Sequence, residues 1–179
     1  MKRAVFLDRD GVLNRSILVE GVPRPPTCIE EVKILPGVVE AIQILKDHDL
    51  LPVVVTNQPD VARRVTSQAH VEAINTYIGS ATNIEYFYSC FHDDANQCEC
   101  RKPSPGLLLR AAKDLGLCIH KSFMVGDRWR DISAGQSAGC QTFFIDYSYP
   151  EQMPKMPFTK VSSLLEAVNL MVGELYGTE

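Results

Sequence analysis

The chain has 179 residues, of which 45% are hydrophobic and 22% charged, and its formal net charge is −4. The length predicts one domain over residues 1–179, and the acidic balance without a basic run argues against a nucleic-acid partner. No apolar stretch is long enough to span a membrane, and the apolar run after Met1 ends at Asp8, too early for a signal peptide. We therefore expect a cytoplasmic protein that acts as a monomer, with its six cysteines as thiols or metal ligands.

Apolar spacing predicts strands that alternate with helices along the chain. The strands are expected at residues 4–7, 52–55, 84–91, 123–125 and 142–145. The helices are expected to start at Pro36, after a Thr66 cap, at Ser104-Pro105, near Asp131, and after Ser162 or Ser163. Residues 15–35, which are rich in proline, are expected to be irregular. Apolar strands that alternate with helices predict an α/β fold in which helices cover both faces of a parallel sheet.

Polar residues follow three of the predicted strands: Asp8-Arg9-Asp10, Thr56-Asn57 and Gly126-Asp127. In open α/β sheets the functional site lies beyond the carboxyl ends of the strands, so these residues are expected to converge. Asp8, Asp10 and Asp127 would then supply oxygen ligands of the kind that Mg²⁺ prefers. The cation would offset the repulsion between neighbouring carboxylates. The alternative interpretation is that Asp8 and Asp10 only form a turn after a strand.

The segment "CFHDDANQCEC" indicates a second metal site. Cys90 and His92 are two residues apart, as are Cys98 and Cys100, so each pair can present its side chains on one face of an extended segment. Three thiolates and one imidazole can complete a closed tetrahedral Zn²⁺ site of the structural kind. The alternative is a set of free cysteines beside a surface histidine.

The motifs "DRDGVLN", "VVVTNQ", "RKP" and "VGDRWRDI" occur in that order, and together they resemble the haloacid-dehalogenase superfamily of phosphatases. The resemblance implies a Rossmann-like three-layer sandwich and a phosphoaspartyl mechanism. It makes Asp8 the nucleophile and Asp10 the general acid/base. Thr56 would hydrogen-bond the transferring phosphoryl group, and Lys102 would neutralise it. Asp127 would complete the Mg²⁺ site.

The zinc loop that runs directly into "RKPSPG" resembles one branch of this superfamily. That branch contains the D-glycero-D-manno-heptose-1,7-bisphosphate phosphatases and the histidinol-phosphate phosphatases, and the loop does not separate them. The run "RKPSPGLLL" is more similar to the heptose enzymes, in which Arg101, Arg128 and Asn57 would contact the substrate. We therefore expect removal of the 7-phosphate of the heptose bisphosphate, a small sugar phosphate, with histidinol phosphate or nucleic-acid ends as alternatives.

Two features separate this chain from the heptose pattern. "PDVARRV" stands where those enzymes have Ser-Gly-Ile-Ala-Arg-Gly, and residues 15–35 are differently spaced, so no role is carried over to them. The segments 11–52 and 57–101 have no room for a folded cap domain, so we expect a capless core bordered by residues 15–35 and the zinc loop. Asp131 is expected either to support the metal site or to cap a helix. Arg9 is expected to have a conformational or a surface role, with a catalytic role as the alternative.

Overall fold

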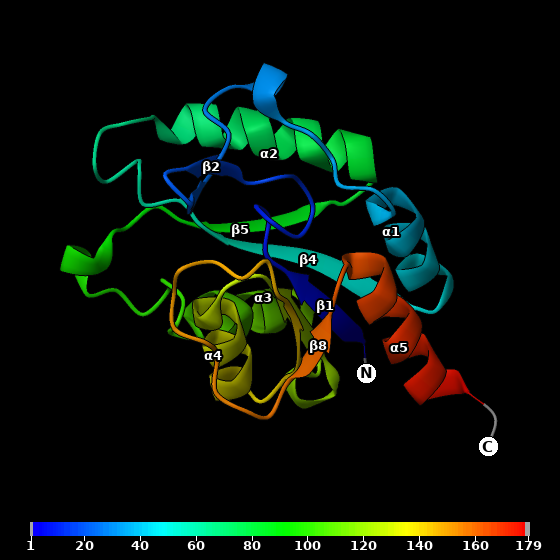
Figure 1. The fold of residues 1–179 in the computed structure, drawn as a ribbon. Helices are drawn as coiled ribbons and strands as arrows, with labels where there is room; N and C mark the ends of the chain where they lie inside the picture. Colours follow the sequence, from blue (N-terminus) through cyan, green and yellow to red (C-terminus); the bar gives the residue numbers. More distant parts are fainter. Residues whose placement is uncertain (1, 178–179) are drawn as a thin grey trace.

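The computed structural model describes residues 2–177 and contains a six-stranded sheet (Figure 1). The spatial order is β5-β4-β1-β6-β7-β8, and every neighbouring pair is parallel. The strands are β1 (Arg3–Leu7), β4 (Leu50–Asn57), β5 (Tyr86–Cys90), β6 (Phe123–Gly126), β7 (Gln141–Ile145) and β8 (Thr159–Val161). The predicted α/β fold with a parallel sheet is confirmed.

Helices cover both faces of this sheet (Figure 1). One layer contains α1 (Val38–Asp47), α2 (Gln68–Thr82) and α5 (Leu164–Tyr176), and the other contains α3 (Gly106–Leu115) and α4 (Trp129–Ala138). Successive side chains of a strand point to opposite faces. Val5 and Leu7 of β1 accordingly belong to the first core, and Ala4 and Phe6 to the second. The continuous apolar run of β1 thus contributes side chains to the cores on both faces of the sheet, as a three-layer sandwich requires.

The segment predicted to be irregular, residues 15–35, instead contains a β-hairpin. Its strands are β2 (Ile17–Val19) and β3 (Val22–Arg24), which pair antiparallel outside the main sheet. The turn residues Glu20 and Gly21 both have positive φ angles, 52° and 79°, as a two-residue hairpin turn requires. The expectation of an irregular segment was wrong, because proline breaks a central strand but is tolerated in an edge strand such as β3. A short 3₁₀ helix, Ile29–Glu31, follows the hairpin.

Two helix starts differ slightly from the prediction. The side chain of Ser67, not Thr66, caps α2 by accepting a hydrogen bond from the His70 amide at 3.2 Å. Helix α1 begins at Val38 rather than at Pro36. Thr66 and Ser67 are adjacent and both residue types can cap a helix, so only the backbone conformation shows which of them caps α2.

The sheet also has a strand that the pattern did not predict, β8, which is three residues long and pairs with β7 at the sheet edge. Such a short segment with Lys160 at its centre carries no apolar run to detect. Within residues 2–177 the segments between the strands form no separate globular lid, as expected for a capless core. In the same range, no helix combines the length and the apolar character needed to cross a membrane.

Candidate active site

The three strands that end in polar residues are neighbours at the centre of the sheet, in the order β4-β1-β6. Their carboxyl ends bring Asp8, Thr56 and Asp127 together, as predicted, and all three are buried. Lys102 enters the site from the loop between β5 and α3. Its Nζ contacts the Asp8 carboxylate at 2.8 Å and also donates a hydrogen bond to the Val55 carbonyl oxygen at 2.7 Å.

Lys102 also pairs with Asp131, whose Oδ1 lies 2.7 Å from Nζ. Burial by itself would lower the pKa of Lys102, but the Asp131 and Asp8 carboxylates raise this pKa above its usual value. The other carboxylate oxygen of Asp131 accepts a hydrogen bond from the Arg128 amide at 3.0 Å, at the start of α4. Asp131 therefore caps α4, as one alternative expects, and it also lies within the carboxylate cluster, while its support of the metal site stays a prediction.

The side chains of Asp8, Asp127 and Asp131 offer carboxylate oxygens that lie within 4.8 Å of one another. Among the described residues 2–177, neither carboxylate oxygen of Asp127 has a hydrogen-bond partner, although both are buried. Burial, followed by the Asp8 and Asp131 charges, raises the pKa of Asp127 well above its ordinary value, and the nearby Tyr149 hydroxyl and Arg128 charge only partly oppose this increase. An unpaired buried carboxylate is costly, and a divalent cation with oxygen ligands would remove that cost. The residues present therefore fit Mg²⁺.

A glycine makes room for this cluster. The φ angle of Gly11 is +88°, and a Cβ atom at this position would lie 1.9 Å from Asp127 Oδ2. Any other residue would be strained here and would displace Asp127. Gly11 in the "DRDG" motif is therefore required by the close approach of the β1 loop to the carboxylate after β6.

Burial is the main cause that raises the pKa of Asp8 to about 7, and the Asp131 and Asp10 charges add to it while Lys102 opposes it. An ionised Asp8 is the form that can act as a nucleophile or a metal ligand. A cation beside Asp8 and Asp127 would favour this form, because an opposite charge at close range lowers the pKa of a carboxylate.

The Asp10 carboxylate lies outside the cluster of Asp8, Asp127 and Asp131. It accepts hydrogen bonds from Arg9, from Asn14 at 2.9 Å and from Gln58 at 2.9 Å. Gln58 also donates to the Thr56 hydroxyl at 2.9 Å, so it connects the two side chains. The Asp10 side chain has a fixed orientation at the cavity and is not among the grouped carboxylates. Its roles as general acid/base and as a Mg²⁺ ligand stay predictions.

Arg9 is fully buried, with 0% of its surface exposed, so the surface alternative for this residue is wrong. Its Nη2 donates to Asp10 Oδ2 at 2.9 Å. The sequence did not indicate this burial, because an arginine in a loop after a strand is ordinarily solvated.

Asn57 uses both ends of its side-chain amide on the backbone of Lys102. Its Nδ2 donates to the Lys102 carbonyl oxygen at 2.9 Å, and its Oδ1 accepts from the Lys102 amide at 3.1 Å. Asn57 lines the cavity, but its amide is engaged in holding the loop that carries Lys102. A direct substrate contact by Asn57 stays a prediction.

A cavity of about 270 Å³ opens above Asp8 and Lys102. Its wall includes Ser16 and residues 22–25 of the segment 15–35, and Asp94 of the zinc loop, so both predicted borders contribute to it. Five arginines contribute to the lining: Arg24, Arg63, Arg101, Arg128 and Arg130. The sequence singled out only Arg101 and Arg128: Arg24 and Arg63 lie outside the recognised motifs, and the resemblance assigns no role to Arg130 within "VGDRWRDI".

Most of these arginines are already paired with acidic side chains. Asp94 Oδ1 accepts from Arg101 Nε at 2.9 Å and lies 3.3 Å from Arg130 Nη1. Arg128 forms an ion pair with Glu151. Since Asp94 has 59% of its side chain exposed, its carboxylate can exchange with another anion at little cost.

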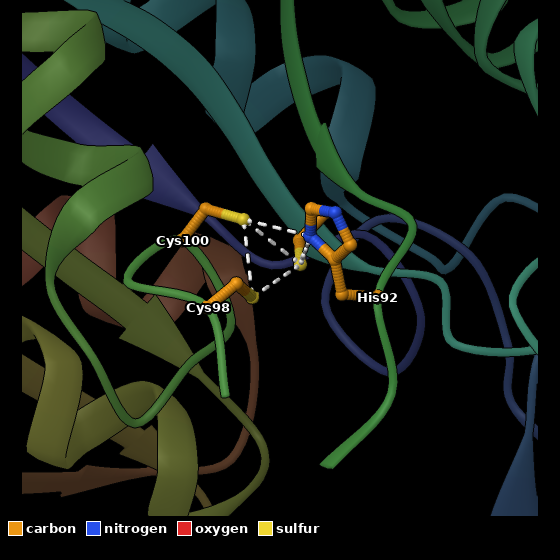
Figure 2. A group of neighbouring side chains, drawn as sticks. His92, Cys98 and Cys100 are labelled. Atoms are coloured by element: carbon orange, nitrogen blue, oxygen red, sulfur yellow. Dashed lines mark hydrogen bonds between the residues drawn. The ribbon is translucent and has the colours of Figure 1, made fainter. Parts of the chain in front are cut away.

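The four predicted zinc ligands, Cys90, His92, Cys98 and Cys100, lie close together. Figure 2 shows three of them, His92, Cys98 and Cys100, with their side chains pointing toward one another. The Cys100 sulfur lies 3.2 Å from that of Cys90 and 3.4 Å from that of Cys98, and the Cys90 and Cys98 sulfurs are 3.7 Å apart. His92 Nδ1 lies 3.3 Å from the Cys100 sulfur. A tetrahedral zinc ion about 2.3 Å from each sulfur would space the sulfurs about 3.8 Å apart, close to these values. The cluster is therefore a plausible zinc site.

Comparison with known proteins identifies the family. The model of the haloacid dehalogenase-like hydrolases matches residues 27–139. The D-glycero-β-D-manno-heptose-1,7-bisphosphate 7-phosphatase of Pasteurella multocida is 36% identical over 77% of this chain and 78% of its own. The enzyme of the same name from Escherichia coli is 32% identical over 78% of this chain and 76% of its own. The chain belongs to this phosphatase family.

A solved structure extends the similarity over nearly the whole fold. The D,D-heptose 1,7-bisphosphate phosphatase from B. bronchiseptica, complexed with magnesium and phosphate, superposes with a TM-score of 0.81 at 26% identity. The match covers 96% of this chain and 99% of that one. The haloacid-dehalogenase assignment, the capless fold and the identification of the chain as a phosphatase are thereby confirmed.

We expect Mg²⁺ to stabilise the protein more strongly near pH 8 than near pH 6. Because the folded protein raises the pKa of Asp8 to about 7, this group supports the metal-free fold at low pH, and that support is lost as the pH rises through 7. The ionised carboxylates then bind Mg²⁺ better. At a free concentration about 100 times the Kd, Mg²⁺ should raise the Tm by about 5–10 °C. Thermal unfolding with and without MgCl₂ measures this, and Asp127→Asn should abolish it. The same Tm with and without the metal at both pH values would contradict the site.

Proposed function

We propose that the protein removes the 7-phosphate of D-glycero-β-D-manno-heptose 1,7-bisphosphate through a phosphoaspartyl intermediate on Asp8. The names of its relatives support the substrate and the anomer. The observation that carries the chemistry is the contact between Asp8 and Lys102 at the base of a cavity whose wall is rich in arginine. We also propose that residues 1–179 act as one domain, because strands from the start, the middle and the end of the chain pair in a single six-stranded sheet.

In the first step a carboxylate oxygen of Asp8 attacks phosphorus, and the bond from phosphorus to the sugar O7 breaks. The Lys102 ammonium offsets the charge on the phosphoryl oxygens, and the Thr56 hydroxyl donates a hydrogen bond to them. Asp10 gives a proton to the departing O7. When bound at Asp8 and Asp127, Mg²⁺ would supply further charge neutralisation.

In the second step water attacks the phosphorus of the aspartyl phosphate. Asp10, which is now ionised, accepts a proton from this water, and the bond between phosphorus and the Asp8 oxygen breaks. Inorganic phosphate leaves, and both carboxyl groups return to their starting states. One carboxyl group can serve both steps because the proton it donates in the first is replaced in the second.

The arginines of the cavity wall favour a substrate with a second anionic group. The phosphate that stays on the sugar can replace the exposed Asp94 carboxylate beside Arg101 and Arg130. Histidinol phosphate has a cationic amine at the corresponding end, which such a wall would repel. The planar guanidinium of Arg101 can bind phosphate oxygens through two parallel hydrogen bonds.

We further propose that the cysteine and histidine cluster holds a structural zinc ion and that Mg²⁺ serves the chemistry. Burial raises the pKa of the Cys90 thiol to about 12, so a thiolate at this position needs a nearby cation. Four protein ligands leave no open coordination position for a substrate. Since Lys102 follows Cys100 by two residues, the ion would fix the loop that delivers this lysine.

Steady-state rates with the heptose 1,7-bisphosphate and with histidinol phosphate, measured side by side, test the proposed substrate. We expect kcat/KM to be at least about 100-fold higher for the heptose bisphosphate, because only that substrate offers two phosphates to the charged cavity. Asp8→Asn should retain the fold but lose turnover, since an amide is a poor nucleophile. Preference for histidinol phosphate would refute the assignment, and an active Asp8→Asn protein would refute the mechanism.

Replacement of Arg101 by alanine should mainly weaken binding of the retained phosphate. We expect KM for the heptose bisphosphate to rise about 10-fold or more, because one charge-assisted contact is lost, while KM for a sugar monophosphate changes little. Arg110, an exposed arginine of α3 outside the cavity, is the matched control, and Arg110→Ala should leave both KM values unchanged. An equal effect of Arg101→Ala on both substrates would exclude the proposed contact.

The zinc proposal predicts that the purified protein contains about one zinc ion per chain. Cys98→Ser should reduce this content and lower the Tm by several degrees, since the loop loses a ligand, while Mg²⁺ still binds. Cys28→Ser, which changes a cysteine outside the cluster, is the control and should retain the zinc. Metal analysis and thermal unfolding measure both effects. A protein that lacks zinc and yet has full activity would contradict the proposal.

A further inference from the structure

A chain of buried polar side chains connects helix α2 with Asp10. The Arg9 guanidinium, fully buried, donates through Nη1 to Asn75 Oδ1 at 2.9 Å. The same guanidinium donates to the Asp10 carboxylate, from Nε at 3.2 Å and from Nη2 at 2.9 Å. Asn75 lies in α2, is 7% exposed, and donates through Nδ2 to the Ser89 hydroxyl at 3.2 Å. None of the recognised motifs contains Asn75.

The orientation of the Asn75 amide follows from the chemistry of its partners. A guanidinium has only donors, so Asn75 must present its oxygen to Arg9 and its NH₂ group to Ser89. Ser89, in the edge strand β5, thereby fixes the amide plane. Asn75 thus gives the guanidinium a second attachment that does not depend on Asp10.

This second attachment matters because Arg9 and Asp10 are adjacent in the chain. If they contacted only each other, they could turn together as one neutral pair. Arg9 supplies most of the hydrogen bonds to the Asp10 carboxylate, and Asn14 and Gln58 supply one each. Anchoring the guanidinium to α2 therefore fixes the direction in which the carboxyl group faces the cavity.

We propose that Asn75 is a positioning residue for catalysis, which holds Asp10 through Arg9 in the orientation needed to protonate the leaving oxygen. Asn75 is not among the residues that line the catalytic cavity, so it acts without touching the substrate. The proposal rests on the proposed function, because it assumes that Asp10 is the proton donor. It adds a contribution of helix α2 to the reaction.

The test compares an alkyl phosphate with 4-nitrophenyl phosphate. The alkyl phosphate is the heptose bisphosphate, or histidinol phosphate if the wild-type protein prefers it. An alkoxide needs a proton to leave, whereas nitrophenolate does not. The measured quantity is kcat/KM, because it reports only the steps up to release of the alcohol. Asn75→Leu removes the acceptor and keeps a side chain that branches at Cγ.

We expect Asn75→Leu to lower kcat/KM about 10- to 100-fold for the alkyl phosphate and less than about 3-fold for 4-nitrophenyl phosphate. Asn75→Asp restores an acceptor for Arg9 and should recover most of the lost activity. Thr82→Val is the matched control, because Thr82 is a buried polar residue of α2 whose hydroxyl donates to the Ile78 carbonyl oxygen of its own helix. Thr82→Val should leave the ratio of the kcat/KM values for the two substrates unchanged.

An equal loss on both substrates in Asn75→Leu, no loss at all, or the same selective loss in Asn75→Asp would overturn the proposal. If Asn75→Leu does not fold, Asn75→Ser, whose side chain is too short to reach Arg9, is judged by the same ratio. Asp10→Asn, measured on the same substrates, separates the two proposals. If it is not selective, the proton-donor role of Asp10 itself fails. If it is selective and Asn75→Leu is not, only the role of Asn75 fails.

Discussion

The contact of the Lys102 ammonium with Asp8 and Asp131 is the interaction on which the rest of the site depends. The carboxylate oxygens of Asp8, Asp127 and Asp131 lie within 4.8 Å of one another, and the Lys102 ammonium contacts two of these three side chains. The third, Asp127, has no hydrogen-bond partner for either oxygen among residues 2–177, so its charge is not directly compensated. The remaining negative charge makes the site suitable for a divalent cation, and a phosphoryl group would bind where that cation and Lys102 meet.

Two separate devices hold Lys102 in place. The Asn57 amide at the end of β4 binds both polar atoms of the Lys102 backbone, and the proposed zinc ion at the cysteine and histidine cluster would constrain the loop immediately before it. A lysine has many rotamers, and burying it costs conformational entropy. Fixing the Lys102 backbone on both sides reduces the range of positions that its ammonium group can occupy in the site.

The upper part of the cavity is organised on a different principle. There, arginines are paired with exposed or partly exposed acids such as Asp94, so their charges are arranged but weakly held. The ion pairs at the base of the cavity are buried, whereas those at the rim can exchange with other anions, so the two regions suit different tasks. The base is suited to a reaction that tolerates little movement, and the rim is suited to taking up and releasing an anionic group of the substrate. The hairpin strand β3 supplies part of the same wall and can vary without disturbing the sheet.

The sequence by itself determined the parallel sheet, the strand ends that carry Asp8, Thr56 and Asp127, and the four candidate zinc ligands. These features are local: an apolar run predicts a buried strand, and the residue after it must lie at the carboxyl edge of the sheet. Only the tertiary structure decided that Asp131 joins the carboxylates, that Asn57 holds the Lys102 backbone, and that Arg9 is buried against Asn75. Each of these depends on contacts between elements that are distant in the sequence or on a side-chain direction. A local pattern specifies neither, because both arise only when the helices pack on the sheet.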